Sequence, residues 1–185
     1  LYPALGTDRS DYTAPQFPSN FTGRNPAFLL FYSIFAKSDN VRGPDKTAVL
    51  KIPFTVSKDE LKAFTDTNAK QGGFGPLFGG AILLAFFVFA AASINLYRLR
   101  GRPIRGNDPS DPETCEIDYK TNIGIGLFYS ALVLSTCLIN PASSLARFIP
   151  QMWLLPIFAF FLAYFSKNQL IRVVGYAIII TLLLN

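Results

Sequence analysis

The residues that could do chemistry gather in one charged stretch, NLYRLRGRPIRGNDPSD, which runs from Asn95 to Asp111. Four arginines in this stretch follow a long apolar run directly: Arg98, Arg100, Arg102 and Arg105. A guanidinium matches the geometry of a phosphate, so Arg102 and Arg105 could hold an anionic lipid headgroup or a phosphate. A topological role explains the same cluster, because basic residues that flank a membrane span collect on the side that is not translocated.

Metal, haem and nucleophilic sites have few candidate residues. The chain has two cysteines, Cys115 and Cys137, and no histidine. Zinc, haem and di-iron sites depend on these residue types or on paired carboxylates within the helices. We interpret the cysteines as unpaired thiols. The sequence also holds no phosphate-binding glycine loop, no G-x-S-x-G and no H-E-x-x-H motif. It therefore predicts a protein that is neither an enzyme nor a metalloprotein.

The overall composition is typical of a membrane protein. Of the 185 residues, 50% are apolar and only 16% are charged, whereas soluble domains carry about 25% charged residues. The net charge of +5 could suggest nucleic-acid binding. The basic residues form no stripe interleaved with aromatic residues, however, so nucleic acid is not a predicted partner.

Four apolar runs are candidate spans, since about 20 apolar residues cross a hydrocarbon core of roughly 30 Å. The first run holds no charge from Gln71 to Tyr97, and the second holds none over residues 121–146. In the third run Pro156 predicts a bend, because proline removes a backbone donor within the helix. The fourth run is long enough only if Arg172 extends its side chain to the interface.

The predicted fold class is an all-α multi-pass membrane protein with four transmembrane helices, or three if the last run does not span. A small α+β or irregular extramembrane module precedes them. The predicted segments are the N-terminal module 1–70, a Gly-rich hinge with the first span 71–97, a charged loop 98–120, and further spans over 121–140, 147–166 and 168–185.

Two helices and one strand are predicted within the module. Asn25 and Pro26 are typical of the first residues of a short helix. The alternation of LKIPFTV, residues 50–56, predicts an edge strand. Ser57 and Glu60 form an S-x-x-E capping box for a helix over residues 58–69.

Three local patterns carry further expectations. The stretch QGGFGPLFGG is either a flexible hinge or a close helix contact through Gly75 and Gly79, at small-xxx-small spacing. Prolines at 103, 109 and 112 predict that the charged loop is not helical. The triplet beginning at Asn20 matches an N-glycosylation acceptor. Because the chain begins at Leu1 without methionine, we expect a cleaved targeting peptide.

The basic residues predict an orientation for the helices. Threading four spans from the arginine cluster places Lys167 and Arg172 on the same side, whereas Lys62, Lys70 and Arg147 lie opposite. The cluster side should therefore be the cytoplasm, stroma or matrix. The N-terminal module then lies on the translocated, lumenal side.

The interiors of the first three spans contain no Asp, Glu, Lys, Arg or His. Pumps and ion-coupled transporters place such groups in the membrane, so transport is not the favoured function. Polar residues such as Asn95, Ser130, Ser135 and Thr136 are expected to bond to their own or a neighbouring helix.

The favoured function is that of a non-catalytic structural or accessory subunit of a large membrane complex. A photosystem-type complex of the thylakoid is favoured over a respiratory complex, and mitochondrial inner or secretory-pathway membranes are the alternative locations. A small channel or carrier, and an assembly factor or scaffold, are the alternative functions. Expected partners are other membrane subunits and lipids. Chlorophyll, carotenoid or lipid are candidate cofactors, and any chlorophyll would need Asn, Gln, a carbonyl or water as its ligand, because the chain lacks histidine.

Overall fold

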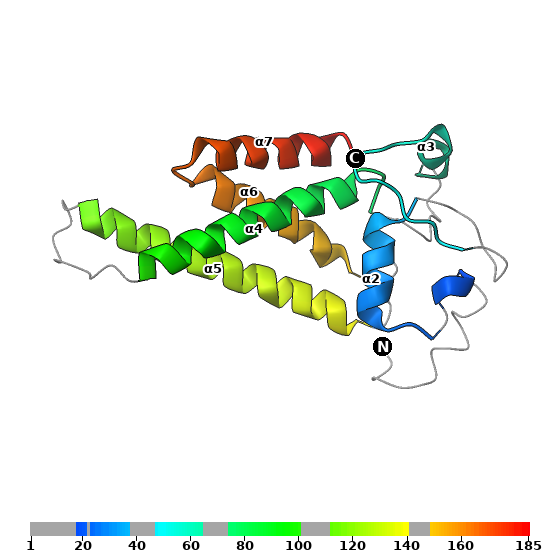
Figure 1. Ribbon diagram of the computed structural model, residues 1–185, viewed down its shortest axis with the longest axis horizontal. Coiled ribbons are helices and arrows are strands. Elements are labelled where there is room, and N and C mark those ends of the chain that lie inside the picture. The colour runs from blue at the N-terminus through cyan, green and yellow to red at the C-terminus, as the bar shows by residue number, and fades with distance from the viewer. Residues whose placement is uncertain (1–17, 22, 38–46, 65–73, 101–111, 141–148) are drawn as a thin grey trace. The chain divides into compact units, whose positions relative to one another are not determined.

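The computed structural model describes residues 18–21, 23–37, 47–64, 74–100, 112–140 and 149–185 (Figure 1). Within these ranges the chain is helical and forms no β-strand. It divides into two compact units. Unit 1 comprises Leu1–Pro76 with Leu138–Ile149, and unit 2 comprises Leu77–Cys137 with Pro150–Asn185.

Unit 2 contains the long apolar helices. Its elements are α4 (Phe78–Arg100), α5 (Pro112–Ile139), the 3-10 turn η5 (Pro150–Trp153), α6 (Leu154–Tyr164) and α7 (Gln169–Leu183). Two segments are long and apolar enough to cross a membrane, Phe78–Leu99 and Lys120–Ile139. The apolar helices Pro150–Tyr164 and Gln169–Leu183 are shorter. The structure therefore supports the helical fold class with two candidate spans.

The predicted 98–120 loop is wrong at both of its ends. Helix α4 continues to Arg100, and α5 begins at Pro112 instead of after residue 120. Proline at the first helical position removes only a donor that would have no partner within the helix, and its fixed φ suits a helix start. Pro112 therefore begins a helix, whereas Pro103 and Pro109 lie outside the described residues.

A bend is predicted at Pro156 inside the third span, but in the structure Pro156 does not lie in the interior of an α-helix. Residues Pro150–Trp153 form a 3-10 turn, and the α-helix begins at Leu154, two residues before Pro156. Pro156 thus lies in the first turn of α6. There its missing N–H removes no bond from the α-helical ladder, and its ring meets no carbonyl of a preceding α-turn.

Helices α4, α6 and α7 pack together around a core of small and β-branched side chains. The core residues are Ala85 and Val88 from α4, Ala159 and Ala163 from α6, and Ile171 and Ile178 from α7. The closest approach is at Gly175 of α7, where an added Cβ would lie 2.6 Å from the Cβ of Ala163. At the other end of α7, Leu77 donates its backbone N–H to Asn185 Oδ1 at 2.6 Å, which joins the start of α4 to the end of α7.

Helix α5 contributes only one narrow face to unit 2. Its buried residues Ile123, Ser130 and Cys137 recur at seven-residue intervals, as on a helix with a single packed stripe. A Cβ added to Gly126, on the same stripe, would lie 2.8 Å from Leu162 Cδ2 of α6. Only 17% of the spanning window of α5 is buried, against 39% for α4. Most of the surface of α5 therefore faces away from the other helices.

Unit 1 contains the short elements η3 (Ser19–Phe21), α2 (Pro26–Phe35) and α3 (Lys58–Phe64). The predicted start of α2 is confirmed, since the side chain of Asn25 accepts a hydrogen bond from Phe28 N at 2.8 Å. The predicted capping box of α3 is also confirmed. Ser57 N donates to Glu60 Oε2, and Glu60 N donates to Ser57 Oγ. Residues 65–69 of that predicted helix lie outside the described residues.

The predicted strand over residues 50–56 is wrong. Leu50 forms a single antiparallel bridge with Ala36, after which the chain turns at Pro53 and Phe54. The turn closes with Thr55 N donating to Ile52 O at 3.3 Å. Proline at the second position of a turn presets φ, which favours this turn over a longer strand.

Polar side chains hold the rest of unit 1 together. The amide of Asn20 pairs with the backbone of Ala48 in both directions, with each hydrogen bond 3.0 Å long. The same Asn20 nitrogen would carry a glycan, so this pairing disfavours glycosylation. Lys51 and Glu60 form an ion pair whose side chains are 6% and 3% exposed. This pair links the segment after α2 to the start of α3.

We predict that Gly175→Ala destabilises unit 2 by about 1–3 kcal/mol, because the new methyl group overpacks the contact with Ala163. Gly124→Ala is the matched control, since nothing lies within 4 Å of the added Cβ on α5. Its higher helix propensity should leave stability unchanged or raise it by up to about 1 kcal/mol. Unfolding equilibria of both variants in detergent test this, and equal losses would contradict the packing role of Gly175.

We predict that Lys51→Met destabilises unit 1 by about 3–5 kcal/mol, because Glu60 is left buried without its counter-ion. Lys58→Met removes an exposed lysine from the same region and should change stability by less than about 0.5 kcal/mol. Denaturant unfolding followed by circular dichroism measures both. Similar values for the two variants would show that the buried pair does not stabilise the unit.

Candidate functional site

The four helices of unit 2 meet around a small cavity near the end of α4. The cavity is about 10 Å³, and its lining comes from every long helix of the unit. Helix α4 contributes Val88, Ala92 and Asn95, and α5 contributes Ile123. Helix α6 contributes Leu162, α7 contributes Ile171, and Ser166 lies in the turn between these two helices. The end of α4, the start of the second spanning segment and the α6–α7 turn therefore share one end of the unit.

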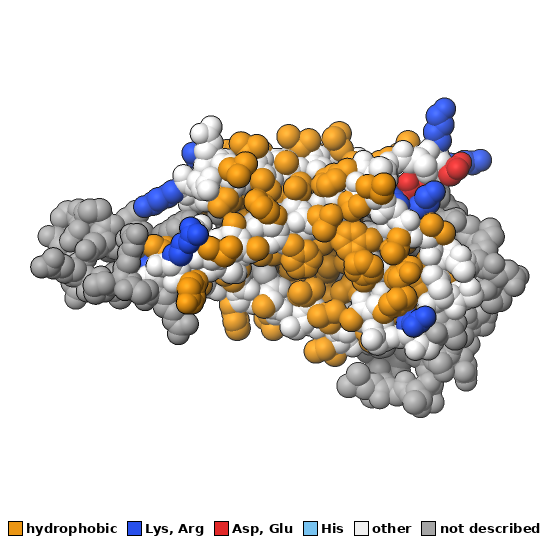
Figure 2. Space-filling model, in the orientation of Figure 1, with side chains coloured by type: hydrophobic (Ala, Val, Ile, Leu, Met, Phe, Trp, Pro, Cys, Tyr) orange, Lys and Arg blue, Asp and Glu red, His pale blue; other side chains and the backbone are white. Residues whose placement is uncertain are grey.

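Basic side chains gather at this end. Arg98 lies three residues beyond the cavity-lining Asn95, and Lys167 and Arg172 directly follow Ser166 and Ile171. All three are exposed. Figure 2 shows lysines and arginines gathered where α6 turns into α7, beside a largely apolar face. The helix ends in this part of the unit thus form a basic cap on an apolar helical body.

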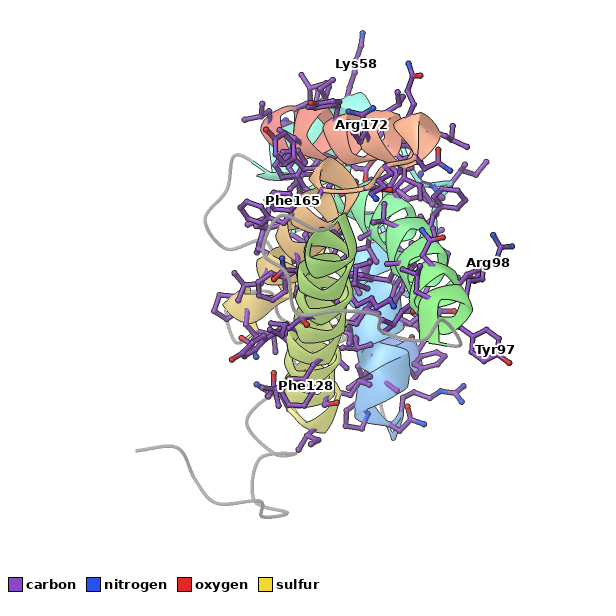
Figure 3. The ribbon with its side chains drawn as sticks, turned by 90° about the vertical axis from the view of Figure 1, so that its left-hand side faces the viewer. Lys58, Tyr97, Arg98, Phe128, Phe165 and Arg172 are labelled. Atoms are coloured by element: carbon purple, nitrogen blue, oxygen red, sulfur yellow. The ribbon has the colours of Figure 1, made fainter. Side chains whose placement is uncertain are left out.

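Exposed aromatic residues accompany the basic ones. Tyr97 is 80% exposed beside Arg98, and Tyr164 and Phe165 are 53% and 63% exposed before Lys167. Figure 3 shows Tyr97 and Arg98 pointing away from the end of α4. Aromatic and basic residues are enriched together at the interface between lipid and water. The combination is what a helical unit presents at the headgroup level of a bilayer.

The four arginines of the predicted cluster differ in what the structure describes. Arg98 is exposed near the end of α4. Arg100 is the last residue of α4, and nothing is described of its side chain, while Arg102 and Arg105 lie outside the described residues. The order of the predicted spans places Lys167 and Arg172 on the same side as Arg98. That their neighbours Ser166 and Ile171 line one cavity with Asn95 follows only from the packing of the helices.

The polar side chains at the cavity are Asn95 and Ser166. Ser166 is 6% exposed, and its Oγ accepts a hydrogen bond from Asn168 N at 3.2 Å. The side chain of Asn95 makes no hydrogen bond within the described part of the chain. The cavity has the minimum volume that a single water molecule requires. The cavity thus brings two polar side chains, Asn95 and Ser166, into a largely apolar interior.

The hydroxyl groups of α5 bond to their own helix, as the sequence predicted. Ser130 donates to Gly126 O, Ser135 to Ala131 O and Thr136 to Val133 O, at 2.7, 2.8 and 2.7 Å. A hydroxyl satisfied within its own helix can face an apolar environment without an unpaired donor. These residues therefore do not form a polar path along α5.

Of the two glycines of the predicted helix contact, only Gly79 lies on a helix, so the contact at Gly79 stays a prediction. Gly75 precedes α4 and has a φ of +102°, which ordinary residues avoid, so it lies in a turn instead of on a helix. Gly79 is buried in the first turn of α4. Among the described residues, an added Cβ would meet a neighbouring helix closely at Gly126 and at Gly175. Gly175 stands alone among larger apolar residues in α7, and such isolation within a helix is a signal that the sequence offers.

No group of three or more metal-ligating side chains occurs among the described residues. Cys137 is a free, buried thiol within α5. Comparison of the chain with protein-family models, curated proteins and solved structures gives no match. Only the fold and the basic end therefore indicate which class of protein this is. These features indicate a helical membrane protein with two candidate spans.

We predict that Asn95→Leu raises the stability of unit 2 by about 1 kcal/mol, because an amide without a partner is replaced by an apolar side chain of similar size. Ser135→Ala removes a hydroxyl already satisfied within α5 and should change stability by less than about 0.5 kcal/mol. Thermal unfolding in lipid nanodiscs compares the two. A loss of stability in Asn95→Leu would mean that the amide is hydrogen-bonded in the membrane.

Proposed function

We propose that this chain is a non-catalytic structural or accessory subunit of a large membrane protein complex. The outward surface of α5 is the observation that carries this proposal. Ile125, Phe128, Tyr129 and Leu132 are each about half exposed or more within the spanning segment. Figure 3 shows Phe128 on the outer side of α5. Because α5 packs against its own unit through one narrow stripe, the rest of its surface can contact lipids and neighbouring subunits.

The chemistry of that surface favours a structural role over transport. Its side chains are mostly large and apolar, and the exposed hydroxyl groups of Ser135 and Thr136 are bonded to the helix itself. Ions and polar substrates need polar or charged groups along their path through the membrane. Contacts with the apolar faces of other subunits, lipids, carotenoids or chlorophylls do not require polar or charged groups. A pigment or lipid would therefore contact α5 through its aromatic and aliphatic side chains.

We further propose four spans, with α6 and α7 crossing as a short pair. The segment of η5 and α6 is about 25 Å long and α7 is about 22 Å long, so both are shorter than a hydrocarbon core of roughly 30 Å. Lys167 and Arg172 can extend from the turn region to the headgroups, which reduces the mismatch. The position of the α6–α7 turn beside the end of α4 supports this arrangement.

The basic end supports a proposal for the orientation. We propose that Arg98, Lys167 and Arg172 face the cytoplasm, stroma or matrix, and that unit 1 faces the translocated side. A thylakoid membrane and a photosystem-type complex are favoured. Unit 1 would then lie in the lumen.

The decisive experiment is native purification of the tagged chain from its own membrane in mild detergent. We predict that the chain migrates with a complex many times its own mass of 20.4 kDa. Mass spectrometry identifies its neighbours, and absorption spectra of the fraction distinguish pigment-bearing from respiratory complexes. Migration as a monomer, together with solute flux through liposomes that hold only this chain, would refute the subunit function in favour of a carrier.

Labelling with a membrane-impermeant maleimide tests the orientation. In a Cys137→Ser background, we predict that Cys115 reacts from one face of sealed vesicles. With Cys115 also changed to serine, Lys167→Cys should react from that same face and Thr47→Cys from the opposite one, because an odd number of spans separates residue 47 from each. Reaction of Thr47→Cys and Cys115 from the same face would refute the orientation. A lack of reaction at Lys167→Cys from the Cys115 face would refute the crossing of α6 and α7.

A further inference from the structure

Unit 1 carries a group of exposed apolar side chains around the Ile52–Thr55 turn. The group, called here the apolar edge, comprises Leu50, Ile52, Phe54, Val56 and Leu61. Ile52 is 76% exposed and Phe54 is 49% exposed. Single exposed apolar residues are normal on protein surfaces, but five within twelve positions form a concentrated surface. The folding of unit 1 does not bury this surface.

The backbone at the centre of the apolar edge is unusual. Phe54 has a φ of +70°, in the left-handed region that glycine and asparagine adopt far more easily. The turn pairs Pro53 with Phe54 at the position where such turns normally place glycine. Strain of this kind persists when it serves something other than local stability. Here it presents a phenyl ring at the tip of a turn, where the ring stays half exposed.

The residues on both sides of the turn are firmly held. Before it, Lys51 N donates to Phe35 O at 2.9 Å, which fixes the chain against the end of α2. After it, Ser57 and Glu60 cap α3, and Glu60 also binds the ammonium of Lys51. The two flanks are therefore joined across the base of the turn. The apolar edge is carried on a fixed support.

We propose that the apolar edge inserts into the interfacial layer of the membrane that the chain's own helices span. The proposal rests on the membrane location given under the proposed function. The chain between Phe64 and Phe78 reaches at most about 50 Å when fully extended, so a membrane crossed by α4 would lie within reach of the apolar edge. Lipid is thus the one apolar medium that the chain's own connectivity supplies.

The charges near the apolar edge suit a lipid interface. Lys58 and Lys62 are exposed on α3, beside the exposed Asp59. Lysines next to inserted aromatic and aliphatic side chains are typical of segments that lie at the headgroup level. Among the described residues at the Leu77 and Asn185 end of unit 2, by contrast, no lysine or arginine occurs. The apolar edge with its lysines would supply on this side the anchor that Arg98 and Arg172 supply on the other.

Tryptophan fluorescence in liposomes tests this insertion. The native Trp153 is changed to phenylalanine, and single tryptophans are introduced as Phe54→Trp, as Thr47→Trp at an exposed polar site of unit 1, and as Phe128→Trp on α5. The full chain is reconstituted in phosphatidylcholine and phosphatidylglycerol vesicles with lipids that carry a spin label near the headgroup. We expect the label to quench Phe54→Trp about threefold more strongly than Thr47→Trp, with a blue-shifted emission.

The other outcomes separate this inference from the proposed function. If Phe128→Trp is quenched by lipid and Phe54→Trp is quenched only by aqueous iodide, the apolar edge does not enter the membrane, although the chain does. If Phe54→Trp is shielded from both quenchers, protein and not lipid covers the edge, and the inference is refuted. If no probe meets lipid, the membrane location itself fails. Ile52→Trp repeats the measurement without altering the strained Phe54 position.

Discussion

An added Cβ on Gly175 would lie 2.6 Å from the Cβ of Ala163, so only a hydrogen atom at this position lets α7 approach α6 this closely. Between helices in lipid there is no hydrophobic driving force, and association depends on close packing and on polar contacts. The core of α4, α6 and α7 follows from this constraint. Alanines on α4 and α6 face isoleucines on α7, and the small partners leave room for the branched ones. The cavity and the basic end exist because these three helices keep a fixed register.

Length and location of the apolar helices could be predicted from the sequence, whereas their packed faces could not. Uncharged runs of sufficient length identify α4 and the spanning part of α5. In a soluble helix, hydrophobic periodicity would identify the inner face. In a membrane-type helix both faces are apolar, because lipid and neighbouring helices offer similar surroundings. Gly126 and Gly175 therefore give no periodic signal.

In unit 1 the local signals were reliable and the longer-range ones were not. The helix starts at Asn25 and Ser57 depend on side chains bonding to backbone groups within three residues, which the sequence shows directly. Residues 50–56 could form a strand only by pairing with a second strand. The alternation of apolar and polar residues shows only which side chains could share a face. In the structure, Leu50 pairs with Ala36 in a single bridge, and the chain then turns at Pro53 and Phe54. The Lys51–Glu60 pair, nine residues apart, has no signature in sequence.

The two units bury different kinds of groups. Unit 1 buries an ion pair and a two-way amide contact, which replace hydrogen bonds that water would otherwise supply. Unit 2 buries mainly alanine, valine and isoleucine, and it satisfies the hydroxyl groups of α5 within that helix. At the start of unit 2, the backbone N–H of Leu77 donates to Asn185 Oδ1, which lies after α7. A backbone donor exposed to hydrocarbon would cost several kcal/mol, so this one polar contact closes the unit at the point where the apolar packing begins.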